Sequence, residues 1–376
     1  MIIGILKETG KENRVALLPG EVSVLRKMGL EILVESHAGE NAFASDKDFE
    51  SSGARPCDRD EVIAKADMLL SVNPPLEDPI ESFREGQILC SVLSPVENKA
   101  WVEKARLRGL SVLALDLIPR TSRAQSMDIL SSMGTVSGYK AVLHAASLLP
   151  RFFPMFMSAA GTIKPSRILI LGAGVAGLQA IAIARKLGAI VEVFDVRSAV
   201  KEEVKSLGGK FIEVEGAKED AAAGGYAVEQ TEEFKLKQQA LIQQRAIAAD
   251  VVIATAQIPG KKAPVLLIKE TVNSMKPGSI IIDLAASTGG NCELTQNGKV
   301  IEVNGVRIIG KSDYPSDLPT DSSRMFGNNL INLLKIMVDK NGNIVLNLQD
   351  DILTGTTAVH GKEYISQRIK QMLHIN

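Results

Sequence analysis

Short apolar runs alternate with longer amphipathic stretches along the chain. In the first half, strand-sized runs rich in branched residues cover positions 2–6, 31–35, 68–72, 87–92 and 110–114. A second series covers positions 167–171, 190–194, 251–254, 279–283 and 306–309. Branched residues favour strands, and strands that alternate with helices are typical of α/β proteins with parallel sheets. The pattern therefore predicts two α/β domains, one for each series.

Longer periodic stretches predict the helices and the domain boundaries. Helices are expected at 19–28, 124–149 and 322–338, and a further strand at 343–346. Gly134 and Gly138 are expected to mark a bend in the longest helix. The predicted architecture is two doubly wound, Rossmann-like domains joined by long helices. The first domain would comprise residues 1–125 plus 312–376, and the second domain residues 126–311.

The composition argues against several classes of function. Lys plus Arg number 43, Asp plus Glu number 44, and only 4% of residues are aromatic, so no nucleic-acid surface is expected. The three cysteines, Cys57, Cys90 and Cys292, are far apart and have no histidine nearby, which argues against a metal site and fits a reducing cytosol. The N-terminus does not resemble a signal peptide, and no apolar run is long enough to cross a membrane. A cytoplasmic protein is therefore expected.

A glycine motif stands between a predicted strand and a predicted helix. Gly172, Gly174 and Gly177 give the spacing G-x-G-x-x-G, which in this context is typical of dinucleotide binding. The first glycine permits a tight turn, the second lets a pyrophosphate approach the backbone, and the third lets helix and strand pack closely. Asp195 ends the next strand, 23 residues after Gly172, where a carboxylate binds ribose hydroxyls and repels a 2′-phosphate. NAD is therefore favoured over NADP, and a tight turn without a ligand is the alternative.

Arg197 does not fit this preference, because a guanidinium beside Asp195 could neutralise a 2′-phosphate. A further candidate contact is the turn Thr255-Ala256-Gln257, which follows a strand at the sheet edge where ligands bind, although an ordinary βα turn is the alternative. The polar segment 213–244 is long for an α/β connection and is either functional or a surface insertion. The candidate nucleotide contacts in these segments are Gly172, Ala173, Gly174, Val175, Gly177, Asp195, Val196, Arg197, Thr255, Ala256 and Gln257.

A second set of polar residues opens the long predicted helix. Arg120 precedes Gln125, Asp128 and Ser131, and these last three are spaced three apart, so they are expected to share a helix face. An amide, a carboxylate and a hydroxyl suit recognition of a nicotinamide carboxamide. The same residues are also typical of a capped and solvated helix start, which stays open as the alternative.

These motifs, in this order, resemble the NAD(H)-binding component of proton-translocating NAD(P) transhydrogenase over nearly the whole chain. The most specific segment is residues 119–128, with support from 224–227 and 258–261. The resemblance implies that Arg120, Gln125, Asp128 and Ser131 surround the nicotinamide and its ribose. It also implies that Gly225, Tyr226 and Ala227 form the tip of a mobile loop that closes over the nucleotide, and that Gln238 and Gln257 contact NAD.

Alanine dehydrogenases share this fold and the start of the chain, so the two families need to be distinguished. Arg14 matches a substrate-binding arginine of that family, which also uses a lysine and a histidine on the amino acid. The matching positions here are Asn73 and Leu93, and neither side chain exchanges a proton near neutral pH. The sequence therefore favours the transhydrogenase subunit.

The resemblance implies a peripheral subunit on the cytoplasmic face of the plasma membrane. The second domain would bind NADH, and a hydride would pass directly to NADP⁺ held by a partner chain. The protein would then supply orientation and proximity without an acid or base at the reacting carbon. A homodimer is expected, associated with an NADP-binding domain and with membrane-embedded subunits that translocate protons. An amino-acid dehydrogenase of altered specificity and a non-catalytic NAD-binding regulatory module stay open as alternatives.

Overall fold

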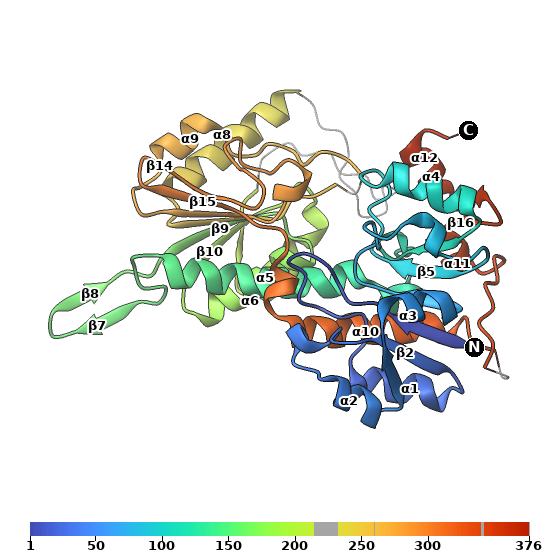
Figure 1. Cartoon of the computed structure of the whole chain (residues 1–376). Helices are drawn as coiled ribbons and strands as arrows, with labels where there is room; N and C mark the ends of the chain where they lie inside the picture. Colours follow the sequence, from blue (N-terminus) through green and yellow to red (C-terminus); the bar gives the residue numbers. More distant parts are fainter. Residues whose placement is uncertain (214–231, 259, 340–341, 376) are drawn as a thin grey trace. The chain divides into compact units, whose positions relative to one another are not determined.

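The structure is a computed structural model and describes residues 1–213, 232–258, 260–339 and 342–375. Two compact units are present (Figure 1). Unit 1 comprises Met1–Met133 with Pro315–Asn376, and unit 2 comprises Gly134–Tyr314. Each unit contains one large sheet with helices on both faces.

Unit 1 is built on a sheet in the order β17-β16-β6-β5-β4-β1-β2-β3. Its strands are β1 (Ile2–Ile5), β2 (Glu31–Glu35), β3 (Ala54–Cys57), β4 (Met68–Leu70), β5 (Ile88–Ser91), β6 (Ser111–Ala114), β16 (Thr357–His360) and β17 (Glu363–Tyr364). β1 to β6 are parallel, whereas β16 is antiparallel to both of its neighbours. The parallel part has the strand order of a doubly wound fold. Successive strands are added on one side of β1 as far as β3, and the chain then crosses to the other side of β1 and continues with β4.

Helices bury the apolar side chains on both faces of the unit 1 sheet. They are α1 (Pro19–Lys27), α2 (Asp46–Ser51), α3 (Arg59–Lys65), α4 (Lys99–Arg108), α10 (Pro319–Lys335), α11 (Asp351–Thr356) and α12 (Gln367–Leu373). One core contains Val22 of α1 and Phe326 of α10, and the other contains Val62 of α3 and Val102 of α4. Burial of these side chains stabilises the layered arrangement.

Unit 2 repeats the same architecture with the strand order β11-β10-β9-β12-β13-β15-β14. The strands are β9 (Arg167–Leu171), β10 (Ile190–Phe194), β11 (Lys210–Phe211), β12 (Val251–Ala254), β13 (Ile280–Asp283), β14 (Val300–Val303) and β15 (Val306–Gly310). The helices are α5 (Ile129–Leu148), which begins in unit 1, with α6 (Val175–Lys186), α7 (Lys201–Ser206), α8 (Glu232–Ala248) and α9 (Lys269–Ser274). β14 is antiparallel to β15, and the other strand pairs described in this sheet are parallel.

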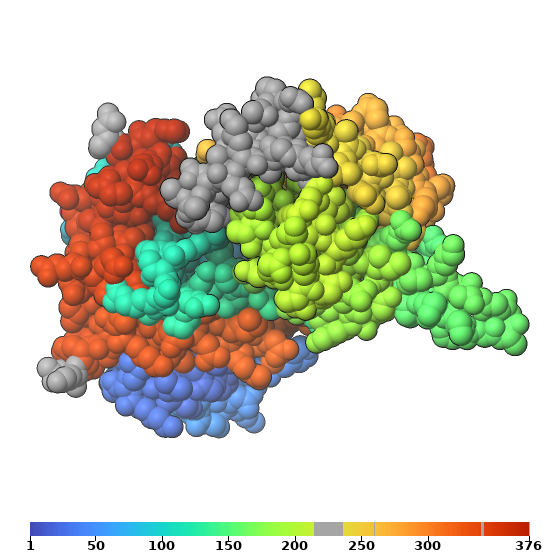
Figure 2. All heavy atoms as spheres, turned by 180° about the vertical axis from the view of Figure 1, so that it is seen from behind, coloured from blue at the N-terminus to red at the C-terminus, as the bar shows by residue number. Residues whose placement is uncertain are grey.

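A hairpin of β7 (Phe156–Ser158) and β8 (Gly161–Ile163) follows α5 and projects from the rest of unit 2 (Figure 2). All six of its strand residues are exposed. Several large apolar side chains in and beside it are exposed as well, among them Met155 at 60% and Met157 at 70%. The apolar side chains of the hairpin therefore remain outside the core of unit 2.

The predicted fold class is confirmed, and the ten strands expected in the two series are all present. The prediction of a strand at 343–346 is wrong, because Ile344 forms only an isolated bridge with Val338. The long helix also begins later than expected, since Ser122–Met127 form a 3₁₀ helix (η4) and α5 starts at Ile129. α10 lies inside unit 1 and therefore does not join the two units. The chain returns from unit 2 to unit 1 within the 3₁₀ helix Tyr314–Asp317.

Among the described residues, no helix has both the length and the apolar character that crossing a bilayer requires. The same residues hold no group of three His, Cys, Asp or Glu side chains that is close enough to bind a metal ion.

Candidate functional site

The glycine motif of unit 2 connects β9 to α6 in the conformation that its spacing predicts. Gly172 has φ of 103°, and a Cβ atom there would lie 2.5 Å from Thr255 Oγ1. A Cβ atom on Gly177 would lie 1.9 Å from the carbonyl oxygen of Gly172, so the start of α6 packs directly against the turn. A Cβ atom on Gly174 would meet none of the described atoms within 4 Å. Two of the glycines are therefore required by packing, and the third borders open space.

Gly174 is also the N-cap of α6, where none of the described side chains caps the helix and the first turn carries no acidic residue. The first N–H groups of a helix carry a partial positive charge and bind phosphate when no side chain occupies them. Open space at Gly174 and an uncapped helix start therefore fit the pyrophosphate of a dinucleotide.

Asp195 follows β10 and is held by four N–H groups. Its Oδ2 accepts from Ala173 N (2.7 Å) and Arg197 Nη2 (2.9 Å), and its Oδ1 accepts from Arg197 N (2.8 Å) and Arg197 Nε (2.9 Å). Burial opposes ionisation, but the hydrogen bonds from Arg197 and Ala173 lower the pKa of Asp195 below its usual value. The carboxylate is therefore ionised at neutral pH and linked directly to the glycine turn.

Gly134 and Gly138 do not break α5, which runs as one helix through both. Instead, a Cβ atom on Gly138 would lie 2.0 Å from the carbonyl oxygen of Ala176. The glycine lets α5 approach the backbone of α6 in its first turn. Gly138 thus serves close helix packing beside the glycine turn.

The segment from Arg120 to Ser131 lies in unit 1 and shows the capped helix start, but not the helix face that Gln125, Asp128 and Ser131 were expected to share. Asp128 accepts hydrogen bonds from Ser131 N (2.9 Å) and Ser131 Oγ (2.6 Å), so it caps the start of α5. Gln125 belongs to η4 and does not share a helix face with these two residues. Arg120 and Gln125 are exposed.

The backbone under these side chains is fixed by long-range contacts within unit 1. Asn329 and Asn332 of α10 donate to the carbonyl oxygen of Ser126 at 2.8 and 3.2 Å. Arg123 forms a fork with Asp350 through two hydrogen bonds of 2.8 and 2.7 Å. The amide of Gln125 is therefore exposed on a 3₁₀ helix whose backbone is held in place by hydrogen bonds.

The remaining candidates fall within the residue range of unit 2. Thr255 Oγ1 donates to the carbonyl oxygens of Leu171 and Gly172, both at 3.1 Å, and Gln257 Nε2 donates to Leu284 O at 2.9 Å. Gln238 is partly buried on α8. Gly225, Tyr226 and Ala227 lie outside the described residues.

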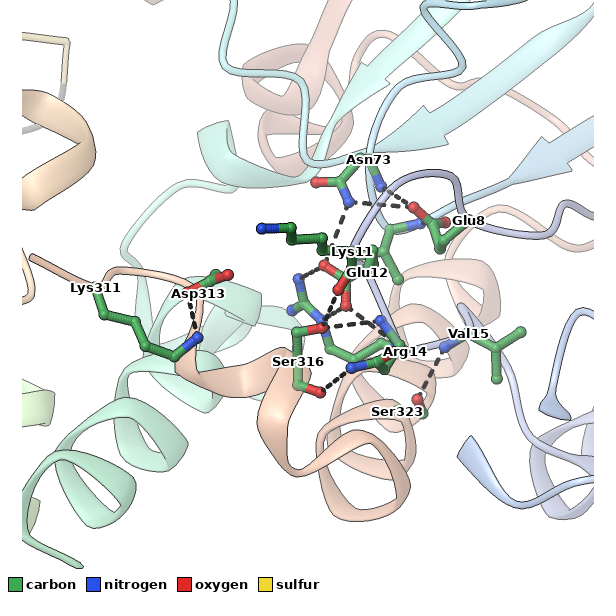
Figure 3. A network of polar contacts seen from close by, with 12 residues as sticks. Glu8, Lys11, Glu12, Arg14, Val15, Asn73, Lys311, Asp313, Ser316 and Ser323 are labelled. Atoms are coloured by element: carbon green, nitrogen blue, oxygen red, sulfur yellow. Dashed lines mark hydrogen bonds and ion pairs between the residues drawn. The ribbon is translucent and has the colours of Figure 1, made fainter. Parts of the chain in front are cut away.

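A polar cluster in unit 1 surrounds Arg14, the residue that matches the substrate arginine of alanine dehydrogenases (Figure 3). Arg14 forms a fork with Glu12, with hydrogen bonds of 2.7 and 2.6 Å. Asn73 Nδ2 donates to Glu8 at 3.1 Å, whereas Leu93 is fully buried and apolar. Asn73 and Leu93 therefore bring no titratable group to this cluster.

Glu8 does bring a titratable group to this cluster, although the sequence analysis did not identify it. Desolvation by burial raises the pKa of Glu8 to about 7, against the hydrogen bonds that its carboxylate accepts from Val72 N and Asn73 N. The signal lay in the segment Lys7-Glu8-Thr9 directly after β1, where a carboxylate reaches the carboxyl end of the neighbouring strand β4.

Two doubly wound units, one with an uncapped glycine turn and a strand-terminal acid, define a two-domain α/β protein of the dinucleotide-binding class. The family described as "Alanine dehydrogenase/PNT, N-terminal domain" matches residues 4–137, and "Alanine dehydrogenase/PNT, C-terminal domain" matches residues 141–367. The chain belongs to this family and, within it, to the NAD(P) transhydrogenase alpha subunits.

Three relatives support that placement. NAD(P) transhydrogenase subunit alpha of Haemophilus influenzae is 45% identical over 97% of this chain and 72% of its own length. An NAD(P) transhydrogenase alpha-subunit chain of Rhodospirillum rubrum is 44% identical over 95% of each chain. The crystal structure of transhydrogenase from Sinorhizobium meliloti superposes with a TM-score of 0.89 at 39% identity, over 97% of this chain and 100% of that chain.

Proposed function

We propose that this chain binds NAD(H) for a proton-translocating NAD(P) transhydrogenase, in which a hydride passes directly between NADH and NADP⁺ held by a partner chain. The observation that carries the proposal is the turn Gly172–Gly177, where Gly174 borders open space at an uncapped helix start. When bound, the nicotinamide ring supplies or accepts the hydride, so the protein has to bind, orient and exclude water.

Asp195 is the proposed ligand of the adenosine ribose and the source of the preference for NAD. Arg197 is engaged in a two-hydrogen-bond fork with Asp195, so its charge is already paired and is not presented alone to a 2′-phosphate. The pairing of Arg197 with Asp195 therefore supports the proposed preference for NAD. Val175 and Val196 are 42% and 38% exposed, which suits apolar side chains that pack on a nucleotide, and Ala173 is fixed by Asp195.

Arg120, Gln125, Asp128 and Ser131 are the proposed contacts of the nicotinamide and its ribose. Asp128 and Ser131 are hydrogen-bonded to each other at the start of α5, so their main effect would be to position the segment. Gln125 has an exposed amide on a fixed backbone, which suits a side chain that orients both the NADH ring and the incoming NADP⁺.

The loop Gly225-Tyr226-Ala227 is proposed to close over the bound nucleotide and to exclude water from it. Gln238 of α8 and the turn Thr255-Ala256-Gln257 are proposed to complete the site. The support for the turn is its position, because it follows β12 and its Thr255 hydroxyl donates to the first glycine of the motif.

A homodimer is proposed on the strength of the β7–β8 hairpin. Phe156, Met157 and Ile163 are 48%, 70% and 43% exposed, and hollows of about 510 and 450 Å³ lie at the hairpin base beside Phe152. Exposed apolar groups of this extent are typical of a protein–protein interface. A second copy is the proposed occupant, since each copy offers both a hairpin and a hollow.

The remaining partners are an NADP-binding domain and membrane-embedded subunits that translocate protons. The proposed location is therefore the cytoplasmic face of the plasma membrane, as a peripheral subunit. Support comes from the placement of the chain among transhydrogenase alpha subunits.

The test is single-turnover hydride transfer between NADH and an oxidised NADP analogue, with and without a partner NADP domain. Transfer is expected only with the partner present, and its absence in the assembled complex would overturn the proposal. Gln125→Asn shortens the side chain by one methylene and is expected to slow transfer ~100-fold while NADH affinity stays nearly unchanged. Ser122→Ala, an exposed neighbour in η4, is the control and should leave both quantities unchanged.

A further inference from the structure

The loop after β13 is organised around a fully buried carboxylate. Asp283 ends the strand and accepts hydrogen bonds from the backbone N–H groups of Asn291 (2.7 Å) and Cys292 (3.0 Å) and from Thr295 Oγ1 (2.6 Å). Gly290 has φ of 81°, and a Cβ atom there would lie 2.9 Å from Asp283 Oδ2. The glycine and the carboxylate together fix the position of Asn291.

The side chain of Asn291 is fully buried and reaches across to the connection that follows β12. Its Oδ1 accepts from Ala256 N (3.0 Å), and its Nδ2 donates to Ala256 O and to Pro264 O, both at 2.8 Å. Its backbone carbonyl also accepts from Leu266 N (2.7 Å) and Leu267 N (3.0 Å). Asn291 therefore holds both peptide groups of Ala256 and also the end of the same connection, at Pro264 to Leu267.

The strand order shows which half of a dinucleotide would meet this connection. β10 and β12 lie on opposite sides of β9, whose carboxyl end carries the glycine turn. Asp195 follows β10, and Ala256 follows β12. With its pyrophosphate over the glycine turn, a dinucleotide would extend its adenosine towards Asp195 and its nicotinamide nucleoside towards Ala256.

We infer that Asn291 is a positioning residue for the nicotinamide half of the nucleotide and acts through the Ala256 turn without touching the ligand. The inference rests on the proposed NAD(H) binding. A planar amide is suited to the task, because it presents an acceptor to one peptide group and donors to two carbonyls at once. Aspartate in its place would set a carboxylate against the carbonyl oxygens of Ala256 and Pro264.

Calorimetric titration of the intact chain with NADH and with ADP tests the inference, because ADP contains only the adenosine and phosphate half. Asn291→Ala and Asn291→Asp are expected to weaken NADH binding by about tenfold or more and to change ADP binding by less than about twofold. Thr295→Val is the matched control, since it removes a hydrogen bond to Asp283 in the same loop but leaves the hydrogen bonds of Ala256 in place. It is expected to lower the thermal midpoint without changing the NADH-to-ADP affinity ratio.

Equal losses of NADH and ADP affinity in Asn291→Ala, or no loss at all, would overturn the inference. Asn291→Ser keeps a small polar side chain and replaces the alanine variant in the titrations where that variant does not fold. Equal affinities of the wild-type chain for ADP and NADH would show that the nicotinamide half adds nothing to binding, and this result would also overturn the inference. A wild-type chain that binds neither ligand refutes the proposed function itself, so the two failures are distinguishable.

Discussion

The two sheets share one doubly wound arrangement but differ at the start of the first helix. In unit 1, α1 begins at Pro19, which has no N–H group, and the N–H of Leu18 donates to Glu21 Oε2 at 3.2 Å. In unit 2, α6 begins after Gly174, and the residues that the structure describes supply neither a capping side chain nor an acidic group in its first turn. Anions bind where helix N–H groups are available, so of these two helix starts the one in unit 2 is equipped for a phosphate.

The doubly wound topology provides the place for a ligand in both units, whereas a few residues at one turn decide whether a nucleotide binds there. The connection after β1 is long and carries the Glu8–Glu12–Arg14 cluster, while the connection after β9 consists of three residues. The proposed nucleotide binding therefore depends on the residues of the turn and not on the fold that the two units share.

The largest effect is expected from Gly177→Ala, compared with Gly20→Ala in α1. A Cβ atom on Gly177 overlaps the Gly172 carbonyl, whereas one on Gly20 meets no described atom within 4 Å. Overpacking should cost about 3 kcal/mol, or roughly a 10 °C fall in thermal midpoint, and NADH binding should be lost with it. Calorimetric unfolding should show Gly20→Ala unchanged or slightly stabilised. Equal behaviour of the two variants would remove the contrast between the units.

Asp195→Ala should give the next largest effect. Hydrogen bonds to a charged group contribute about 1.5–3 kcal/mol, so the dissociation constant for NADH should rise roughly 30-fold. NADPH binding should change less, because Arg197 loses its partner and becomes available to a 2′-phosphate. Titration with both nucleotides measures the ratio, and an unchanged preference would show that Asp195 does not determine it.

Glu8→Gln should change the pH dependence of stability in unit 1. Burial raises the pKa of Glu8 from 4.5 to about 7, so the folded state binds a proton that the unfolded state releases. The contribution of Glu8 to stability is complete below pH 4.5 and is lost as the pH rises to about 7, which costs up to ~3 kcal/mol. Urea unfolding of Glu8→Gln should lack this decline, whereas the exposed control Glu50→Gln should retain it. A decline of the same size in Glu8→Gln would contradict the assignment.

No measurable activity is expected with alanine. Asn73 and Leu93 stand where alanine dehydrogenases use a lysine and a histidine, and Arg14 is already paired with Glu12. Glu8 is the titratable group that makes the assay informative, because its raised pKa would suit proton exchange. Spectroscopic assay of NAD reduction by alanine, without a partner chain, should give a blank rate. A steady rate would place unit 1 among substrate-binding domains.

Much of the fold was predictable because buried parallel strands carry continuous branched runs. The strands at 31–35, 167–171, 190–194 and 251–254 were predicted to the residue. The short strands at or near the sheet edges, β3, β11, β14, β16 and β17, were missed, because such strands carry a weak hydrophobic signal. Ile344 and Leu346 gave the false strand, since Ile344 packs into the unit 1 core but pairs through an isolated bridge.

The glycine turn and the acid that follows it could be read from the chain alone, because both depend on residues close together in sequence and on backbone sterics that are the same in any such turn. The folded chain was needed to establish that Arg197 is paired with Asp195, that Gly138 serves packing against α6 and that burial raises the pKa of Glu8. The same holds for Asn291, whose partners Ala256 and Pro264 lie 35 and 27 residues earlier. Hydrogen bonds over such separations and the desolvation of a carboxylate depend on how distant segments meet, and no local pattern encodes that.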